Sequence, residues 1–263
     1  MRAVSDGERA LWAETALLAV RGAGRIQRER VGTATVERKG AADITTDVDR
    51  ACEAFVVELT RKRHPTHEIL GEEGSEGRRG ASHLWIVDPL DGTKNYAHGY
   101  GRSCVSLALA VDGQVVLGAV FNARAEELFF AALGQGATLN GAPIHVALTE
   151  TLDRAMVASA LAYSGRGADS AQLQRLGKVL AVVEAVRSDG CAALDLCDVA
   201  CGRFDAYFER GLHAWDTAAG ALIVEEAGGR VSNSGGAPHD LYGQDTVATN
   251  GRLHLALLPL VAL

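Results

Sequence analysis

Several features that would assign a chain to a secreted, disulfide-linked or membrane-spanning class are missing from this sequence. Its five cysteines include no Cys-x-x-Cys pair, and an odd count without paired spacing is typical of the reducing cytoplasm. No basic segment followed by an apolar run opens the chain, so we expect no signal peptide. The apolar segment 253–260 is too short to span a bilayer and is expected to pack on the core. These absences predict a cytoplasmic protein that does not enter a membrane.

The sequence also lacks an excess of positive charge, a fixed-period repeat and a low-complexity tract. Its formal net charge of -7 argues against nucleic acid as a partner. An anion can still bind locally where metal ions supply the positive charge. The 263 residues are 48% hydrophobic and 22% charged, which suits one large globular domain or two small ones. Cys197 and Cys201, one helical turn apart, are interpreted as small buried residues.

Hydrophobic periodicity predicts two helices and then antiparallel hairpins in the first half of the chain. The helices are expected over 8–30 and 47–63, and the hairpins over 104–147, with turns at Asp112-Gly113 and Asn140-Gly141. The residues expected to face inward are Leu11, Thr15, Leu18 and Ala19 in the first helix and Ala51, Phe55, Val56 and Leu59 in the second.

Beyond about residue 150, strand-like and helical segments alternate. Strands are expected over 156–158, 182–186 and 204–208, and helices over 168–181, 190–201 and 216–227. The fold class is therefore α+β in the first half and α/β in the second. We expect an α+β domain over 1–148 with an antiparallel sheet, and an α/β domain over 149–263.

One segment carries more chemistry than any other. Four apolar residues form a buried strand that Pro89 is expected to end, and Asp88 and Asp91 then stand three residues apart. Two like charges side by side need a positive partner, and carboxylate oxygens suit Mg²⁺. Gly92 lets a phosphate approach the backbone, and Thr93 follows with a hydroxyl. An ordinary turn is the alternative interpretation, because Asp-Gly is common in turns.

Further acidic residues also stand where apolar segments end. Glu72 follows a short strand and enters a glycine-rich loop, Asp216 opens a helix, and residues 43–49 form an acidic entry into a helix. Each has a structural alternative: Asp216 is a natural N-cap, and Glu73 and Glu76 suit solvated loop positions. The repetition favours a metal and phosphate site, because such sites form at strand ends in α/β proteins.

These motifs resemble those of the inositol monophosphatase family, which comprises magnesium-dependent, lithium-sensitive phosphatases. The matching segments lie at 43–49, 71–74, 85–95 and 215–220, in the family's order and spacing. The similarity extends over nearly the whole chain. It implies a layered α-β-α-β-α sandwich, a phosphomonoester hydrolase of the EC 3.1.3.25 type and a homodimer. The implied substrate is a small phosphorylated polyol or a related phosphomonoester.

The resemblance also implies roles for single residues. Thr93, oriented by Asp49, would polarise the attacking water, and Glu72 would assist. The implied ligands of two or three Mg²⁺ ions are Glu72, Asp88, the Leu90 carbonyl, Asp91 and Asp216. The implied substrate contacts are Asp91, Gly92, Thr93, Gly190, Cys191, Ala192, Glu209 and Asp216. Lys39 and Glu73 are placed beside the metal cluster.

The residues around these motifs leave the substrate open. Lys94 is familiar among relatives that act on phosphoadenosine phosphate or histidinol phosphate, or it is an exposed lysine at a helix start. Residues 95–99 and 190–196 look more like the inositol branch. Cys191 stands where a threonine is usual, and Gly101-Arg102 replaces the usual Pro-Phe, so that Arg102 could meet a second anionic group or face solvent. A histidinol-phosphate, 3′-phosphoadenosine-5′-phosphate or sugar-phosphate phosphatase is therefore the alternative.

Two alternatives lie outside catalysis by this family. A haloacid-dehalogenase phosphatase needs its two aspartates separated by one residue near the start of a chain, whereas two residues intervene here. A non-catalytic regulator that binds macromolecules stays open, although every ligand position is filled. His213 is expected to pack near the site rather than bind metal, and His64 and His67 receive no role. Loops 75–83 and 160–170 are expected to be mobile, and the first could close Glu72 over the metals.

Overall fold

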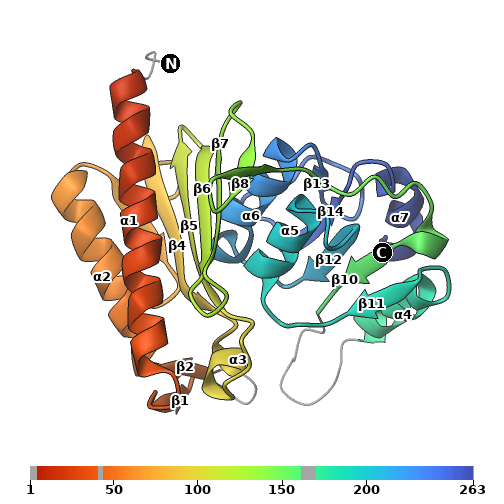
Figure 1. Cartoon of the computed structure of the whole chain (residues 1–263), viewed down its shortest axis with the longest axis horizontal. Coiled ribbons are helices and arrows are strands. Elements are labelled where there is room, and N and C mark those ends of the chain that lie inside the picture. Colours follow the sequence, from red (N-terminus) through yellow and green to blue (C-terminus); the bar gives the residue numbers. More distant parts are fainter. Residues whose placement is uncertain (1–4, 41–43, 161–169, 263) are drawn as a thin grey trace.

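The computed structural model of the chain describes residues 5–40, 44–160 and 170–262. These residues form alternating layers of helices and sheets, which follow one another from left to right in Figure 1. The first, third and fifth layers are the helix pairs α1 (Asp6–Arg30) with α2 (Asp47–Arg63), α5 (Ala192–Ala200) with α6 (Ala214–Glu226), and α4 (Ser170–Leu180) with α7 (His254–Val261). The predicted α-β-α-β-α sandwich is confirmed.

The second layer is a largely antiparallel sheet. In spatial order it contains β3 (Glu68–Gly71), β4 (His83–Asp91), β5 (Cys104–Val111), β6 (Gln114–Asn122), β7 (Glu127–Ala132), β8 (Ala137–Leu139) and β9 (Ala142–Ile144). Only β3 and β4 pair in parallel within this described sheet. The turns at Asp112-Gly113 and Asn140-Gly141 have φ of 49° and 84°, and of 51° and 82°. Two successive positive φ angles define a hairpin turn, so both predicted turns are confirmed. A short ribbon of β1 (Val36–Arg38) and β2 (Ile44–Thr46) precedes α2.

The helices α1 and α2 cover one face of this sheet, and the periodicity predicted the buried side of α1 only in part. Thr15 and Ala19 are buried as expected. In α1, Leu11 and Leu18 are 40% and 45% exposed, and the buried face consists mainly of small residues such as Ala16, Ala19 and Ala23. Small side chains allow helices and sheets to approach closely, and this packing outweighed the hydrophobicity of the leucines. In α2, Val56 is buried as expected, whereas the buried positions also include Cys52, Glu53 and Thr60.

The fourth layer is a mixed sheet. It contains, in spatial order, β11 (Ala185–Arg187), β10 (Met156–Ala158), β12 (Ala206–Arg210), β14 (Asp245–Thr249) and β13 (Arg230–Ser232). The first two pairings are parallel, as expected of an α/β unit, but β14 runs antiparallel to both neighbours. The expected strands over 182–186 and 204–208 begin two to three residues too early, and β13 and β14 were not predicted. The helix expected over 168–181 corresponds to α4, which spans Ser170–Leu180; 168 and 169 lie outside the described residues.

The middle layer joins both sheets through one hydrophobic core. Phe129 of β7 and Leu84 of β4 belong to the same buried cluster as Ile223 of α6 and Tyr207 of β12. Gly118 of β6 makes a close approach possible, since a Cβ atom there would lie 2.7 Å from the Ala219 carbonyl oxygen of α6. The domain boundary expected at 148/149 falls in the segment that connects β9 to β10.

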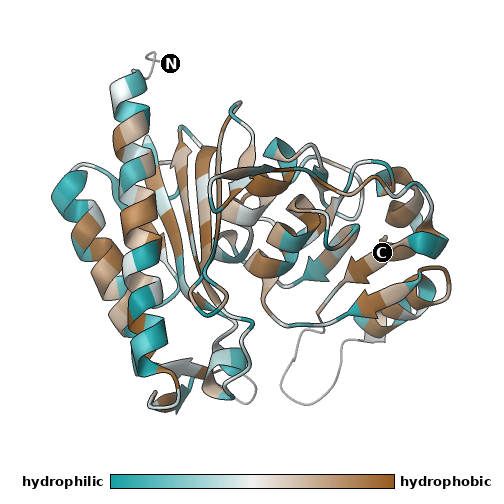
Figure 2. Cartoon of the chain, in the orientation of Figure 1, coloured by the Kyte–Doolittle hydropathy of each residue, from teal (hydrophilic) through white to brown (hydrophobic). Residues whose placement is uncertain are grey.

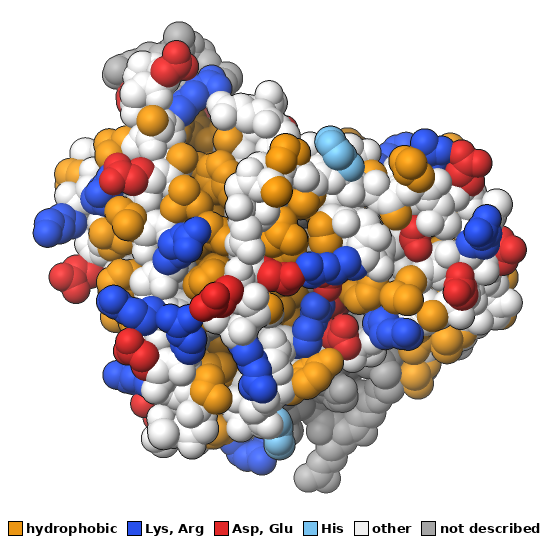
Figure 3. Space-filling model, in the orientation of Figure 1, with side chains coloured by type: hydrophobic (Ala, Val, Ile, Leu, Met, Phe, Trp, Pro, Cys, Tyr) orange, Lys and Arg blue, Asp and Glu red, His pale blue; other side chains and the backbone are white. Residues whose placement is uncertain are grey.

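The apolar C-terminal segment packs on the core as predicted, with Leu253, Leu257 and Val261 fully enclosed. Within the described ranges, no helix combines the length and the apolarity needed to cross a membrane. In Figure 2, hydrophobic residues dominate the strands, whereas α1 and α2 alternate between hydrophobic and hydrophilic residues. The face seen in Figure 3 carries basic and acidic side chains next to one another.

Candidate active site

The end of β4 supplies the first two predicted metal ligands. Asp88 is buried, and its Oδ1 accepts a hydrogen bond of 2.9 Å from the Leu90 amide. The strand does not end at Pro89 as expected, but continues to Asp91 with a shift of register between Asp88 and Asp91. A proline has no amide hydrogen and is tolerated at such irregularities. The bulge directs both carboxylates toward the middle helical layer.

Gly92 follows at a position that admits no side chain. Its φ is 84°, in the left-handed region, and a Cβ atom would lie 2.5 Å from the Arg102 carbonyl oxygen. The short helix α3 (Thr93–Ala97) begins immediately after it. The predicted reason for this glycine was access for phosphate; the close approach of Arg102 is a second requirement for it.

Asp91 faces the start of α5, where three predicted substrate contacts lie. Its Oδ2 accepts a hydrogen bond of 2.7 Å from the Ala193 amide, and the Cys191 thiol lies 3.2 Å away. Gly190 precedes this turn with a φ of 69°. Burial raises the pKa of Asp91, and the amide and thiol hydrogen bonds oppose this rise. The structure therefore brings Gly190, Cys191 and Ala192 beside the end of β4, as the resemblance implied.

Glu72 enters from the loop after β3. Burial raises its pKa to about 7, Lys39 opposes this rise, and Glu73, Asp49 and Asp91 add to it. Lys39 forms an ion pair with Glu73, whose side chain is only 5% exposed. Glu73 is therefore enclosed, and its interpretation as a solvated loop charge is wrong. Asp43, in the neighbouring motif, lies outside the described residues.

Asp216 approaches from the opposite side, on α6. The helix begins at Ala214, so Asp216 is its third residue and not the N-cap that the sequence suggested. Its Oδ2 accepts a hydrogen bond of 2.6 Å from the His213 amide. Burial raises the pKa of Asp216 well above its usual range, and Asp91 and Glu72 add to the effect. His213 itself is exposed and stacks on Trp215 with ring centroids 4.7 Å apart.

Glu72, Asp88, Asp91 and Asp216 are all buried enough for their pKa values to be raised. Burial raises the pKa of Asp88 well above its usual range, and Glu72, Asp91 and Asp216 each raise it further. No three acidic side chains of the described residues bring ligand oxygens within 4.8 Å of one another. That these groups lie near one another is indicated by the effect of each charge on the pKa of the others. Hard oxygen donors of this kind fit divalent cations that retain water and phosphate ligands. Cations would also relieve the mutual repulsion.

Thr93 and Asp49 form the predicted catalytic pair. The Thr93 Oγ1 atom lies 2.9 Å from the Asp49 Oδ1 atom and 2.9 Å from the Leu90 carbonyl oxygen. Asp49 is held by α2, where its Oδ2 accepts the Thr46 amide at 2.9 Å and the Thr46 hydroxyl. This capping box fixes the carboxylate, while burial raises the pKa of Asp49. The same residue thus caps a helix and orients Thr93.

Glu209 lies on β12 with its side chain enclosed. Its Oε2 accepts a hydrogen bond of 2.6 Å from the Tyr207 hydroxyl. Burial raises the pKa of Glu209 to about 7, and the Tyr207 hydrogen bond opposes the rise. Glu209 and Asp91 each raise the pKa of Asp216, which places these carboxylates in one neighbourhood.

Arg102 neither faces solvent nor stays free for a second anionic group. Its guanidinium donates hydrogen bonds of 2.7 Å to Asp195 and to Asp198 on α5. The Arg102 carbonyl accepts the Asn95 amide at 2.8 Å, so this residue ties α5 to the loop around Gly92. Both expectations for Arg102 are wrong, because acidic residues on a helix more than 90 positions away neutralise it. Lys94 is exposed at the second position of α3.

Glu53 is the residue that the sequence did not single out. It is buried on α2, and its carboxylate accepts the amides of Glu73 and Ser75 at 2.8 and 3.0 Å and the Ser75 hydroxyl at 2.8 Å. A Cβ atom on Gly71 would lie 2.4 Å from the Glu53 Oε2 atom. Glu53 therefore holds the loop that carries Glu72. An acidic residue next to Cys52 on the buried side of an amphipathic helix was the available signal.

A cavity of about 400 Å³ lies between the start of α1 and β6 and β7, and apolar side chains line most of it. None of the predicted ligands borders this cavity. A smaller cavity of about 190 Å³ lies beside Asp216 and is lined by residues such as Arg79, His213, Trp215 and Tyr242. The chemistry of the side chains, and not cavity size, identifies the site.

Comparison with known proteins covers almost the whole chain. The model described as "Inositol monophosphatase family" matches residues 8–262. An inositol-1-monophosphatase of Synechocystis sp. is 43% identical over 224 residues, which cover 84% of this chain and 78% of that protein. A Nus factor SuhB of Pseudomonas aeruginosa is 40% identical over 251 residues, which cover 92% of this chain and 93% of that protein. The crystal structure of the extragenic suppressor protein suhB from Bartonella henselae matches with a TM-score of 0.89 at 34% identity, covering 94% of this chain and 97% of the other.

Proposed function

Because the chain belongs to the inositol monophosphatase family, we propose that this phosphatase acts on an inositol monophosphate and uses magnesium ions. Its relatives identify it as a phosphomonoester hydrolase of a metal-dependent family. The observation that carries the finer proposal is the group of Glu72, Asp88, Asp91 and Asp216. These carboxylates come from three separate segments, and each has a raised pKa caused by burial and by the others.

The proposed metal is Mg²⁺, in two or three ions. Glu72, Asp88, Asp91, Asp216 and the Leu90 carbonyl would hold them, and these are the hard oxygen donors that Mg²⁺ prefers. When bound, the ions would neutralise charge on the phosphate and lower the pKa of the attacking water. Inhibition by lithium is expected from the family resemblance alone.

The chain's own contribution to proton transfer is the Thr93–Asp49 pair. When the Thr93 hydroxyl donates its hydrogen bond to Asp49 Oδ1, the hydroxyl oxygen still has lone pairs that can accept a hydrogen bond from a water. The water is thereby oriented for in-line attack. The fixed position of Asp49 in its capping box keeps this pair aligned before substrate arrives.

Glu209 and the turn before α5 are proposed to contact the alcohol part of the substrate. Enclosed Glu209 can accept hydrogen bonds from a polyol hydroxyl, in keeping with its hydrogen bond from Tyr207. Gly92 and Gly190 both have positive φ angles, and we assign their backbone to contacts with the phosphate and the alcohol. An inositol monophosphate satisfies both requirements.

The test is a phosphate-release screen with purified protein in Mg²⁺ and in chelator. Inositol 1-phosphate, histidinol phosphate, 3′-phosphoadenosine 5′-phosphate and a sugar bisphosphate are the substrates. We expect the highest kcat/KM for inositol 1-phosphate and no release in chelator. A preference for another compound would contradict the proposed substrate, and release from none of them would favour a macromolecule-binding regulator.

Two further proposals concern the protein in the cell. All five cysteines are free thiols, which suits a cytoplasmic location. The family resemblance favours a homodimer, which light scattering of the purified protein would test.

A further inference from the structure

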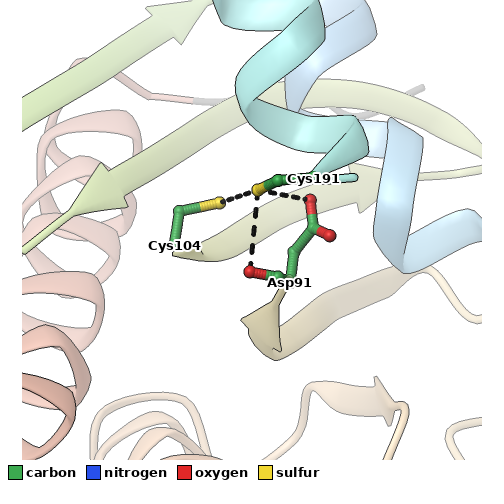
Figure 4. Close-up of side chains that lie close together, drawn as sticks. All are labelled: Asp91, Cys104 and Cys191. Carbon is green, nitrogen blue, oxygen red and sulfur yellow. Dashed lines mark hydrogen bonds between the residues drawn. The ribbon is translucent and has the colours of Figure 1, made fainter. Parts of the chain in front are cut away.

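Two buried cysteines meet directly behind the proposed metal site. Cys104 begins β5, where it pairs with Asp91 in the sheet, and Cys191 immediately precedes α5. Their sulfur atoms lie 3.7 Å apart, and the two side chains point toward each other in Figure 4. Among the described residues, no other two cysteine sulfurs lie within hydrogen-bond distance of each other.

The sulfur of Cys191 also contacts Asp91, a proposed metal ligand. The Cys191 Sγ atom lies 3.2 Å from the Asp91 Oδ2 atom and 3.6 Å from the Asp91 carbonyl oxygen. Among the His, Cys, Asp and Glu side chains of the described residues, Asp91, Cys104 and Cys191 form the one group of three whose potential metal-ligand atoms all lie within 4.8 Å of one another. The Ala193 amide completes the surroundings of the Asp91 carboxylate at 2.7 Å. A change at Cys191 therefore reaches Asp91 without an intermediary.

We propose that Cys104 and Cys191 form an oxidative modification site, in which a hydroperoxide converts the two thiols into a disulfide and thereby weakens metal binding through Asp91. The inference rests on the proposed function only in taking Asp91 as a metal ligand. The disulfide itself requires nothing from the phosphatase reaction.

The chemistry balances with the peroxide as oxidant. With hydrogen peroxide, one sulfur attacks a peroxide oxygen as its thiolate and the O–O bond breaks, so that the sulfur becomes a sulfenic acid and the released hydroxide takes up the thiol proton and leaves as water. The second sulfur then displaces the sulfenic oxygen, which leaves as a second water while the S–S bond forms. Two electrons pass from the sulfurs to the peroxide oxygens. A thiol reductant reverses the bond.

The geometry indicates which side moves. A disulfide needs a sulfur separation of about 2.05 Å, so the two atoms must approach by more than an ångström. Cys104 is held in the sheet between β4 and β6, whereas Cys191 lies in a turn after Gly190, whose φ is 69°. Movement of Cys191 toward Cys104 removes its thiol from Asp91 and shifts the start of α5. Asp91 then loses the thiol contact, and the Ala193 amide that also holds its carboxylate is displaced with α5.

The experiment uses the full-length protein and hydrogen peroxide, with and without Mg²⁺. Treated protein is alkylated and digested, and mass spectrometry detects the peptide that links 104 to 191. Calorimetry measures Mg²⁺ affinity on the same samples. We expect the linked peptide, loss of two thiols per chain and at least a tenfold lower Mg²⁺ affinity, all reversed by dithiothreitol.

The matched variants are Cys104→Ala and Cys52→Ala. Cys52 is equally buried, but its sulfur faces the Ala23 carbonyl oxygen at 3.4 Å. After peroxide, C104A is expected to give no linked peptide and to keep its Mg²⁺ affinity within twofold, whereas C52A behaves like the parent. If C104A fails to fold, Cys104→Ser replaces it.

Four outcomes overturn the inference. Thiols consumed without a 104–191 peptide exclude the site. A linked peptide with unchanged Mg²⁺ affinity, or with no Mg²⁺ binding before treatment, excludes the coupling to metal. An equal loss of affinity in C104A assigns the effect to Cys191 alone. A protein that releases no phosphate contradicts the proposed function, but peptide mapping and calorimetry still decide the disulfide.

Discussion

Asp88 is the most enclosed of the proposed carboxylate ligands, and it has two roles that can be separated. As a hydrogen-bond acceptor it holds the Leu90 amide at 2.9 Å. As a negative charge it repels three neighbouring carboxylates, which raise its pKa. An asparagine retains the acceptor oxygen and removes the charge, so the two duties can be measured apart.

We expect Asp88→Asn to lower kcat/KM by about 10²- to 10³-fold, because a metal site loses a charged ligand. Without metal, the variant should unfold at the same temperature as the parent or higher, because a buried repulsion is removed. Phosphate release and thermal unfolding in chelator are the measurements. Asp205→Asn is the control, since Asp205 is buried but binds the Met156 amide in the second sheet. Near-normal turnover in D88N would contradict the ligand assignment.

At this scale the sequence was informative where a side chain's chemistry and its neighbours along the chain define its role. Asp88, Asp91 and Gly92 share one short segment, so a strand followed by two carboxylates predicted their association. Arg102 could not be predicted, because its partners Asp195 and Asp198 are distant along the chain. Periodicity carries no information about which distant helix neutralises a charge.

The loop after β3 shows the same dependence at the scale of elements. Glu53 of α2 accepts three hydrogen bonds from Glu73 and Ser75, so a helix holds the loop that presents Glu72. The sequence suggested instead a mobile loop over 75–83 that closes upon metal binding, and this motion stays a prediction. The expected mobile loop at 160–170 lies almost wholly outside the described residues.

We expect Glu53→Ala to raise the Mg²⁺ concentration for half-maximal activity about tenfold, because Glu72 loses its support. The free energy of unfolding should fall by about 1–3 kcal/mol, since buried amides lose their acceptor. Glu53→Gln keeps one acceptor oxygen, so its magnesium dependence and its free energy of unfolding should lie between those of the parent and of E53A. Magnesium titrations of activity and urea unfolding measure these effects. An unchanged magnesium dependence in E53A would show that the loop does not need this support.

A second contact between elements involves histidines to which the sequence assigned no role. His67 stacks on His64 and His83 with ring centroids 4.7 and 4.3 Å apart, and its Nδ1 accepts the Trp85 indole at 3.1 Å. Burial lowers the pKa of His67 to about 4, and the neighbouring imidazoles lower it further. Neutral imidazoles can stack in this way, whereas protonated ones repel.

The unfolded chain binds a proton on His67 below its ordinary pKa of 6.5, while the folded chain does so only near 4. The folded state therefore binds fewer protons in this window, and stability is lost as pH falls from 6.5 toward 4. His67→Asn keeps an acceptor for Trp85 and cannot be protonated, so its unfolding free energy should depend less on pH in that window. His145→Asn, at an exposed histidine, is the control. Equal pH slopes in H67N and the parent would refute this origin.

Element types were predictable wherever periodicity is long, as in α1, α2 and the hairpins. The buried face of α1 was predictable only in part. Thr15 and Ala19 are buried as expected, but Leu11 and Leu18 are exposed because small residues such as Ala16 pack more closely on the sheet. Short strands such as β13 form through pairing with β14, and a three-residue segment has too few positions to show an alternation.

At the scale of the whole molecule, the buried carboxylates oppose folding in the absence of metal. The pKa values of Glu72 and Glu209 rise to about 7 from an ordinary 4.5. The folded state therefore binds more protons than the unfolded state between these values, and stability falls as pH rises through the window. The histidines act in the opposite sense below pH 6.5, so the carboxylate effect is clearest above it.

In chelator, we expect the unfolding temperature to fall between pH 6.5 and about 8. Saturating Mg²⁺ should raise it, and by more at the higher pH, since cations replace the protons. At 100 times the dissociation constant, one site contributes about 2.7 kcal/mol. Differential scanning calorimetry with calcium chloride as the comparison salt measures both. An unfolding temperature that rises with pH in chelator would show that ionisation of these carboxylates does not destabilise the folded state.

The central core has a consequence for how the polypeptide is made. Leu84, Ala108 and Phe129 of the first sheet stay uncovered until α5 and α6 emerge from the ribosome, because those helices begin only at Ala192 and Ala214. Glu72, Asp88 and Asp91 are likewise synthesised long before Asp216. With these four residues as the proposed ligands, we expect the nascent chain to bind its full set of cations only when α6 docks, so that activity arrives together with a closed interior.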